Sequence, residues 1–323
     1  MRGSAIIGRT LAGTKMNSKT FKTLAQEYLA HRRAFGFSLE VAGNVVSSFA
    51  RFADRTAPGK PLRISLALQW SMRRPALPVT VANRLSAIRG FARYCASVDP
   101  RTQIPPSHLT YDVGRRRAPH IFTKAQIDLI LSRSKSLRPW RTNLRPLTYV
   151  TLLALLACTG LRPSEVWLLR DEDFDPAAQT LRIRSVKCRP ERIIPLHPST
   201  VRALGSYQRK RKAQFPIGHQ FFVGPFGRPL QIHAISKMFR QLVRGIPSNG
   251  ARTCLRLYDL RHTFATRQIA RWARRAAPPA HHLALLSRYL GHKYFRSTYW
   301  YVQQKGSVLR TASHRFQCYS DQL

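Results

Sequence analysis

The longest apolar run in the chain, residues 147–158, most constrains what this sequence can fold into. The run has about twelve residues and is preceded by Arg141 and Arg145. A helix that crosses a bilayer needs about 20 apolar residues, so this run is too short to span a membrane. A helix that is apolar on every side must instead lie inside a protein core. We therefore expect a buried helix here and no membrane association.

The charge of the chain predicts its partner. The sequence has 55 Lys and Arg residues against 14 Asp and Glu, which gives a formal net charge of +41 over 323 residues. A compact protein with this charge repels itself unless a polyanion neutralises it. Nucleic acid does so through phosphate contacts that release counterions. A ribosomal-type protein and a codon bias that enriches arginine are the alternative explanations.

The cysteines and histidines indicate neither a disulfide framework nor a metal site. The cysteines are odd in number, widely scattered and without CxxC or Cys/His ligand spacing: Cys95, Cys158, Cys188, Cys254 and Cys318. Other histidines match no ligand spacing and are interpreted as surface or packing residues: His219, His233, His281 and His282. The N-terminus has no continuous apolar segment like that of a signal peptide. We expect a cytoplasmic, nucleoid-associated protein without a metal.

Helical periodicity marks a first domain at residues 17–107. Residues 1–16 are polar and aperiodic, and are either a disordered tail or translated sequence upstream of a true start at Met16. Four helical segments follow between about residues 20 and 100. The second is expected to bury Val41, Val45, Phe49 and Phe52, and the fourth to bury one face of residues 80–95. Arg84, Arg89 and Arg93 lie off that buried face.

A proline-bearing basic linker at residues 108–119 separates this domain from a second one at 120–323. Thr123 is a suitable N-cap for a helix over residues 124–132. Gly160 is expected to end the buried helix, which places Arg162 on a turn between two buried helices. A charge in such a place is costly unless it is paired, for example with Glu165, or serves a ligand.

The remaining pattern of the second domain predicts mostly helices and one β-hairpin. Residues 180–196 alternate like two strands with a turn around residues 188–191. Helices and turns follow to about residue 250, and Phe221, Phe222 and Val223 form a short buried element. The fold class is therefore mainly α with a small β-hairpin or sheet, in two domains.

The stretch from Tyr258 to Tyr301 carries the chemistry. It contains Arg261, whose planar fork of donors matches two phosphate oxygens. It also contains His292, after a Leu-Gly turn, which can donate a hydrogen bond or handle a proton near neutral pH. A tyrosine can attack phosphorus and form a covalent intermediate. The residue types alone do not separate Tyr301 from its neighbours Tyr294 and Tyr299.

Three motifs of this stretch resemble the tyrosine recombinase (phage integrase) family: LRHTFAT at 260–266, YLGH at 289–292 and STYWY at 297–301. The longer run LLSRYLGHKYFRSTYWY is similar to the transposon-borne branch of that family. TGLR followed by SE matches the family's first catalytic arginine and assigns that role to Arg162. The family interval of nine residues after His292 favours Tyr301 as the nucleophile.

The resemblance also implies a hairpin lysine and exposes a departure. The family's lysine lies five residues before the arginine of an R-x-x-P-L string, which is Lys187 here, although Arg184 or Arg189 could be the more important phosphate contact. The family's H-x-x-R box reads Tyr258 to Arg261, so tyrosine replaces histidine. That phenol can only donate or relay a hydrogen bond near neutral pH. The adjacent His262 is expected to point elsewhere on the helix.

The function that the resemblance implies is site-specific DNA cleavage and rejoining through a 3′-phosphotyrosyl bond, without metal, ATP or another cofactor. The helical domain would clamp double-stranded DNA, and its arginines could contact DNA or form a solvated face. A homo-oligomer such as a tetramer on DNA, or an assembly with sister recombinases, would carry out the exchange. A helix after Tyr301 would either dock on a neighbouring protomer or pack on its own. The alternatives are an inactive accessory DNA-binding protein and, with a poorer match, a type IB topoisomerase.

Overall fold

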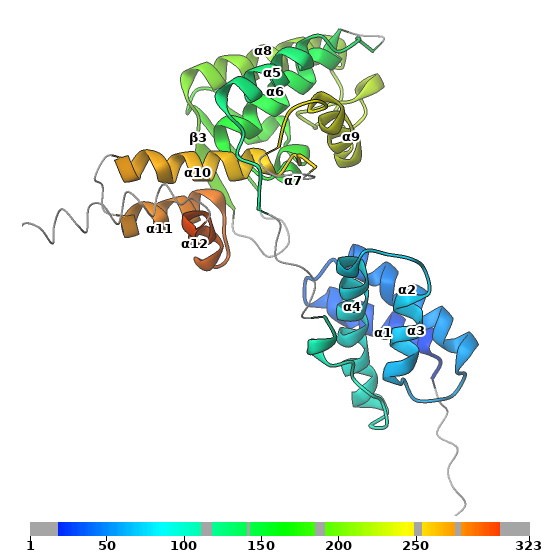
Figure 1. Ribbon diagram of the computed structural model, residues 1–323. Coiled ribbons are helices and arrows are strands. Elements are labelled where there is room, and N and C mark those ends of the chain that lie inside the picture. The colour runs from blue at the N-terminus through cyan, green and yellow to red at the C-terminus, as the bar shows by residue number, and fades with distance from the viewer. Residues whose placement is uncertain are drawn as a thin grey trace, which may run out of the picture. The chain divides into compact units, whose positions relative to one another are not determined.

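The computed structural model describes residues 19–110, 118–140, 143–184, 191–248, 254–274 and 279–303 of the chain (Figure 1). Its contacts divide the chain into two compact units, Met1–Arg116 and Arg117–Leu323. Each unit has its own hydrophobic core. The described ranges are mainly helical with one small antiparallel sheet, which confirms the predicted fold class. Within them no helix combines the length and the apolarity that crossing a membrane requires.

The first unit is a bundle of helices followed by a short 3-10 turn. The elements are α1 (Phe21–Ala34), α2 (Glu40–Thr56), α3 (Ile64–Met72), α4 (Pro78–Val98) and η1 (Ser107–Thr110). The Asp54 carboxylate on α2 accepts the backbone N–H groups of Phe21 and Lys22 at 2.7 and 2.9 Å. These N–H groups have no partner within α1, so Asp54 caps α1 from the neighbouring helix. The predicted inner face of α4 is confirmed at Leu85, Ile88, Phe91, Ala92 and Cys95.

The predicted inner face of α2 is wrong at its N-terminal end. Val41 is 79% exposed, because α2 begins only at Glu40 and its first turn extends past the core. Leu39 precedes the helix in the left-handed conformation, with φ 44°. The buried stripe of α2 contains Gly43, Val46, Phe49, Ala50, Phe52 and Ala53. Phe49 and Phe52 are therefore buried as predicted, whereas the buried valine is Val46 and not the predicted Val45.

The second unit surrounds one buried helix. Its helices are α5 (Lys124–Lys135), α6 (Leu144–Thr159), α7 (Pro163–Trp167), α8 (Pro198–Gln214), α9 (Ile232–Leu242), α10 (Asp259–Arg274), α11 (Pro279–Leu290) and α12 (Arg296–Gln303). The 3-10 turns are η2 (Asp171–Asp173) and η3 (Pro225–Gly227). The apolar run forms most of α6, against which α5, α8 and α10 pack. Thr123 caps α5 as predicted, by accepting the Gln126 N–H at 3.2 Å.

The sheet has the strand order β1-β2-β3, with β1 (Phe174–Asp175), β2 (Thr180–Ile183) and β3 (Arg192–Pro195). Leu181 of β2 lies opposite Ile194 of β3, and both side chains are fully buried. This pairing confirms the two predicted strands. No sequence pattern predicted β1, because two residues are too few for a period-2 pattern.

A second, smaller hydrophobic cluster lies between α10, α11 and α12, which Figure 1 shows side by side in orange and red. Its buried members are Ala265, Ile269, Leu286, Leu290 and Tyr301. The cluster therefore fixes α12 against α10 and holds the end of α11 between them.

Gly160 is the residue that ends α6, and only glycine suits its place. It has φ +63°, and a Cβ built there would lie 2.4–3.1 Å from the side chain of Phe264. A left-handed non-glycine residue is strained, and these contacts add steric overlap with α10. The carbonyl of Gly160 also accepts a hydrogen bond from Arg261 at 2.9 Å. The turn therefore links α6 to α10.

We predict that Gly160→Ala lowers the free energy of unfolding by about 2–4 kcal/mol, from left-handed strain plus overpacking. Urea denaturation followed by circular dichroism would measure this change. Gly205→Ala is the matched control, because Gly205 lies inside α8, where alanine meets only the tip of Arg209 at 3.5 Å. The control should leave stability unchanged or raise it by up to about 1 kcal/mol. Equal effects of the two changes would contradict the proposed role of the Gly160 turn.

Candidate active site

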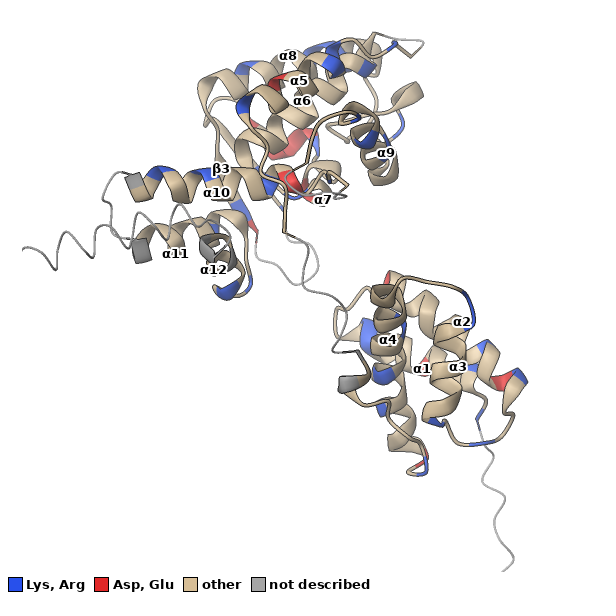
Figure 2. Cartoon of the chain, viewed as in Figure 1, with Lys and Arg blue, Asp and Glu red and all other residues tan. Residues whose placement is uncertain are grey.

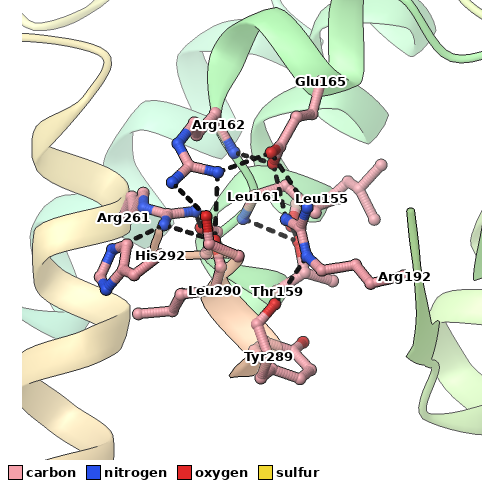
Figure 3. A network of polar contacts seen from close by, with 12 residues as sticks. Leu155, Thr159, Leu161, Arg162, Glu165, Arg192, Arg261, Tyr289, Leu290 and His292 are labelled. Carbon is pink, nitrogen blue, oxygen red and sulfur yellow. Dashed lines mark hydrogen bonds and ion pairs between the residues drawn. The ribbon is translucent and has the colours of Figure 1, made fainter. Parts of the chain in front are cut away.

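Arg162 lies at the start of α7, directly after the Gly160 turn, and its side chain is buried (Figure 3). Its Nη1 donates to Glu165 Oε1 at 2.8 Å and to the Leu290 carbonyl at 3.1 Å. Its Nη2 donates to the Gly291 carbonyl at 2.8 Å. The pairing with Glu165 that the sequence suggested is therefore present. The same guanidinium also reaches the end of α11, so the pair does not account for all of its contacts.

Arg261 comes from α10 and meets the same carbonyl. Its Nη2 donates to the Leu290 carbonyl at 2.7 Å and lies 3.0 Å from His292 Nε2. The residue is 1% exposed. Burial lowers the pKa of Arg261, and the nearby charge of Arg162 lowers it further. Two like charges brought this close in a buried place are costly unless an anion joins them.

His292 follows a tight turn at Gly291, which has φ +65°. Its Nδ1 lies 2.7 Å from Thr298 Oγ1 on α12. Because a guanidinium only donates, His292 Nε2 accepts from Arg261. The proton of the neutral ring is then on Nδ1, from which it is donated to Thr298. Two contacts thus set both the orientation and the tautomer of this imidazole.

Tyr301, on α12, is 3% exposed and packs against His292 with ring centroids 6.1 Å apart and planes 16° apart. Burial raises the pKa of Tyr301, while the charge of Arg261 and a hydrogen bond from it act in the opposite direction. The phenol is therefore protonated near neutral pH. The two competing tyrosines, Tyr294 and Tyr299, are 64% and 50% exposed. Of these three tyrosines, only Tyr301 is buried and packed against His292.

The prediction that His262 points away from the site is wrong. Its ring lies 5.4 Å from that of Tyr301 and 5.1 Å from that of Tyr258. Residues 258 and 262 are one helical turn apart and share a face, and α12 packs on that face of α10. Burial first, then the charges of Arg256 and Arg261, lower the pKa of His262 to about 4. Tyr258, at the place of the family histidine, is 39% exposed at the edge of this stack.

Glu165 and Arg192 complete the network. The sequence pattern assigns Arg192 no role beyond marking the register of Lys187. Both oxygens of Glu165 bond to Arg192, at 3.1 Å from Nη1 and 2.8 Å from Nη2. Burial raises the pKa of Glu165, but the hydrogen bonds and charges of Arg192 and Arg162 outweigh burial and bring it to about 2. Glu165 is therefore ionised at neutral pH. Arg192 is itself the arginine of the R-x-x-P-L string, and nothing in that string indicates a pairing with Glu165.

The hairpin residues are only partly described. Lys187 and Arg189 lie outside the described residues. Arg184, just after β2, bonds to Glu172 and donates to Asp173 at 2.7 Å. The structure therefore places the Arg184 side chain on carboxylates of η2, and it does not join Arg162 and Arg261.

The three arginines of α4 differ in what they contact. Arg84 donates to the Ser71 carbonyl at 2.8 Å, and Arg89 donates to the carbonyls of Pro105 and Pro106 at 2.7 and 2.9 Å. Arg84 therefore bonds to the C-terminal end of α3, and Arg89 holds the loop before η1 in place. Arg93 is exposed. Figure 2 shows Lys and Arg distributed over the helices of both units, with few Asp and Glu between them.

The residues 120–307 match the model of the phage integrase family, and the chain belongs to that family. It is 36% identical over 307 residues to y4rB of Sinorhizobium fredii, a protein named as an integrase/recombinase, covering 92% of this chain and 97% of that one. It is 27% identical over 228 residues to the tyrosine recombinase XerC of Chlamydia pneumoniae, covering 69% and 67%.

Solved structures share the fold at low sequence identity. The Tn1549 transposon integrase in complex with transposon right end DNA is 18% identical with a TM-score of 0.65, and the match covers 92% of this chain and 99% of that chain. A lambda integrase dimer bound to a COC′ core site is 16% identical with a TM-score of 0.62, and the match covers 90% and 79%. These likenesses agree with the mainly helical two-domain class.

We predict that Thr298→Val disturbs the His292 tautomer. Valine has nearly the same shape as threonine but accepts no hydrogen bond, so the Nδ1 proton of His292 loses its partner. The side-chain ¹⁵N shifts of His292, measured by long-range ¹H–¹⁵N NMR, should move toward an averaged pattern. Thr298→Ser, which keeps the hydroxyl, should preserve the wild-type shifts. Identical spectra for the valine variant and the wild type would show that Thr298 does not set the tautomer.

We also predict an acid-sensitive step in stability from His262. The folded-state pKa is about 4, below the value of about 6.5 for an unfolded histidine. As pH falls from about 6.5 to 4, the unfolded chain gains a proton that the folded chain excludes, so stability decreases by on the order of 1–3 kcal/mol. Urea denaturation at several pH values should show a flatter dependence for His262→Gln. His219→Gln, at an exposed histidine, is the control that should keep the wild-type slope.

Proposed function

We propose that the protein is a site-specific DNA recombinase or integrase that cuts and rejoins DNA through a 3′-phosphotyrosyl intermediate. The observation that carries this proposal is the convergence of four side chains from separate elements. Arg162, Arg261, His292 and Tyr301 meet around the end of α11 through the contacts given above. Such a group offers cationic donors, an imidazole and an oxygen nucleophile for one phosphodiester.

In the proposed reaction the two arginines bind the non-bridging oxygens of the scissile phosphate. A guanidinium matches two such oxygens with parallel hydrogen bonds, and burial strengthens its electrostatic effect. The phosphate would take N–H groups of Arg162 and Arg261 that now bond to backbone carbonyls and to Tyr301. His292 Nε2 accepts from Arg261 and so holds that guanidinium at the same edge. The negative charge that develops on the non-bridging oxygens is therefore met by arginine donors that are already held in place.

Tyr301 then attacks phosphorus, forms the bond from its oxygen to phosphorus and breaks the bond to the 5′-oxygen. Its phenol proton passes during the attack to an imidazole whose ring contacts the phenol ring, either that of His262 or that of His292. Lys187 is the proposed acid that protonates the departing 5′-oxygen. A 5′-hydroxyl of another strand reverses these steps on a new partner. The phosphotyrosyl bond conserves the energy of the broken bond, so the scheme requires no ATP, metal or other cofactor.

Double-stranded DNA is the proposed partner, and transposon or other mobile-element integration is the proposed role. The net charge of +41 supports DNA binding. The Tn1549 integrase structure contains transposon right end DNA, and lambda integrase structures contain a dimer on a core site and a tetramer on a Holliday junction. We propose a similar multimer on DNA here, either of this chain alone or with sister recombinases, and a nucleoid location. The proposed DNA contacts of the helical unit are Arg84, Arg89 and Arg93.

Tyr258 supports a second candidate function. If the family histidine is essential at this place, the chain would be a DNA-binding accessory subunit with impaired cleavage. The structure offers His262 one turn away, in contact with Tyr301, as an imidazole on the same face of α10. This contact favours the active enzyme over the accessory subunit.

A nicked suicide duplex tests the proposed function. The duplex should carry the inverted repeats of the element's ends, so that the cleaved strand loses a short fragment and the covalent adduct accumulates. We predict adduct formation by the wild type and a loss of at least 1,000-fold in Tyr301→Phe, which lacks the attacking oxygen. Adduct is measured by denaturing gel electrophoresis with labelled DNA.

Tyr294→Phe and Tyr299→Phe are the matched controls, because each removes one exposed phenol from the same segment. Both should keep adduct formation within about threefold of the wild type, since exposed substitutions of this kind change little. Loss of the adduct in either control with retention in Tyr301→Phe would reassign the nucleophile. Binding of the authentic site without any adduct would favour the accessory subunit.

A further inference from the structure

Arg192, the first residue of β3, has a buried guanidinium whose three nitrogens are all engaged within the protein. Nε donates to the Tyr289 carbonyl at 2.8 Å, and the two terminal nitrogens form the fork on Glu165. Its side chain is 10% exposed. Figure 3 shows the guanidinium groups of Arg192 and Arg162 both directed at the Glu165 carboxylate. An arginine buried in this way is poorly placed to bind DNA itself, so its role must lie in what it holds.

The Glu165 carboxylate is shared between two arginines. Oε1 accepts from Nη1 of Arg162 and Nη1 of Arg192, at 2.8 and 3.1 Å. Oε2 accepts from the backbone N–H of Arg162 and from Nη2 of Arg192, at 2.9 and 2.8 Å. Two cations and one anion leave one positive charge. Glu165 can therefore orient Arg162 without cancelling the charge that a phosphate would meet, because Arg192 balances the carboxylate.

The second contact of Arg192 is at the C-terminal end of α11. Carbonyls at the end of a helix lack partners within the helix and carry partial negative charge. Three successive carbonyls here accept from arginines: Tyr289 from Arg192, Leu290 from Arg162 and Arg261, and Gly291 from Arg162. His292 is the next residue in the chain. Arg192 therefore fixes the helix end that presents His292.

Gly291 fits closely against this arginine. A Cβ added at Gly291 would lie 2.8 Å from Nη1 and 3.0 Å from Cζ of Arg192. Glycine is thus required twice at this turn, for its φ of +65° and for the approach of the guanidinium. The arrangement brings β3, α7 and the end of α11 to one point.

We propose that Arg192 is a positioning residue for the strand-cleavage reaction. It keeps Glu165 charge-balanced, so that Arg162 retains its positive charge, and it anchors the turn that carries His292. The inference rests on the proposed function of Arg162 and His292 toward a phosphate. Arg192 would act on the reaction indirectly, through Glu165 and the Tyr289 carbonyl.

The test compares two scissile groups in the same nicked suicide duplex. One is the ordinary phosphodiester, and the other is a methylphosphonate, in which a methyl group replaces one non-bridging oxygen and removes the negative charge. Because a methylphosphonate is neutral, its cleavage depends less on the positive charge of the site. Arg192→Met should slow single-turnover adduct formation on the phosphodiester by about 10- to 100-fold, and on the methylphosphonate by no more than about threefold. Arg192→Lys, which keeps the charge but loses the fork, should lie between these values.

Two further variants separate the parts of the proposal. Arg202→Met removes an exposed positive charge from α8 of the same unit and should leave both rates within about twofold of the wild type. Glu165→Gln combined with Arg192→Met should cleave the phosphodiester faster than Arg192→Met alone, because the uncompensated carboxylate is gone. Equal slowing of Arg192→Met on both scissile groups would overturn the proposal, as would no gain in the double variant.

One measurement needs no DNA and no cleavage. The side-chain ¹⁵N shifts of His292 should move in Arg192→Lys, which retains the charge and volume needed for folding, and stay unchanged in Arg202→Met. Unchanged His292 shifts in a folded Arg192→Lys protein would overturn the positioning role even if the wild type cuts no DNA. Absence of adduct in the wild type and in Arg202→Met on both scissile groups would instead contradict the proposed function.

Discussion

The hydrogen bonds at the Leu290 carbonyl are the interaction on which the candidate site depends. This oxygen accepts from Arg162 at 3.1 Å and from Arg261 at 2.7 Å. The two arginines come from α7 and α10 and would repel each other without an acceptor between them. The carbonyls at the end of α11, which lack partners within the helix, supply that acceptor, because a helix terminus carries partial negative charge. Segments separated by more than a hundred residues are thereby held around one helix end.

Carboxylates are scarce in this basic chain, and several of them serve as internal anchors. Glu165 orders two arginines, and Asp54 caps α1 from α2. Asp171, the first residue of η2, pairs with the buried Arg211. Asp173 accepts from Arg184 at 2.7 Å. Acidic residues placed in this way stabilise the fold at particular points and leave most of the surface cationic. The high net charge is therefore compatible with a folded protein.

Much of the fold could be predicted from the sequence because the signals were local. The apolar run, the Thr123 cap and the Gly160 turn each depend on neighbouring residues, and each is present in the structure. The candidate residues Arg162, Arg261, His292 and Tyr301 followed from motif spacing, and the structure brings them together. Their roles in a reaction stay predictions.

What the sequence could not predict depends on contacts between distant segments. The inward placement of His262 requires α12 to pack on α10, and residue spacing on one helix cannot show that. The part played by Arg192 requires β3 to lie beside both α7 and the end of α11. Val41 was misplaced because a periodic apolar pattern does not say where the core ends. Each of these three misses therefore concerns tertiary packing, which overrides local preference.

Tyr301 has a double place in the molecule, since it is both the candidate nucleophile and a member of the small cluster between α10, α11 and α12. Removing its whole side chain would open a cavity in that cluster, which typically costs about 3–5 kcal/mol for a large aromatic residue. Any motion that carries the ring toward a phosphate also loosens the cluster, so binding of DNA has to supply contacts that compensate. The reactivity of Tyr301 and the stability of the cluster between α10, α11 and α12 are thus thermodynamically coupled.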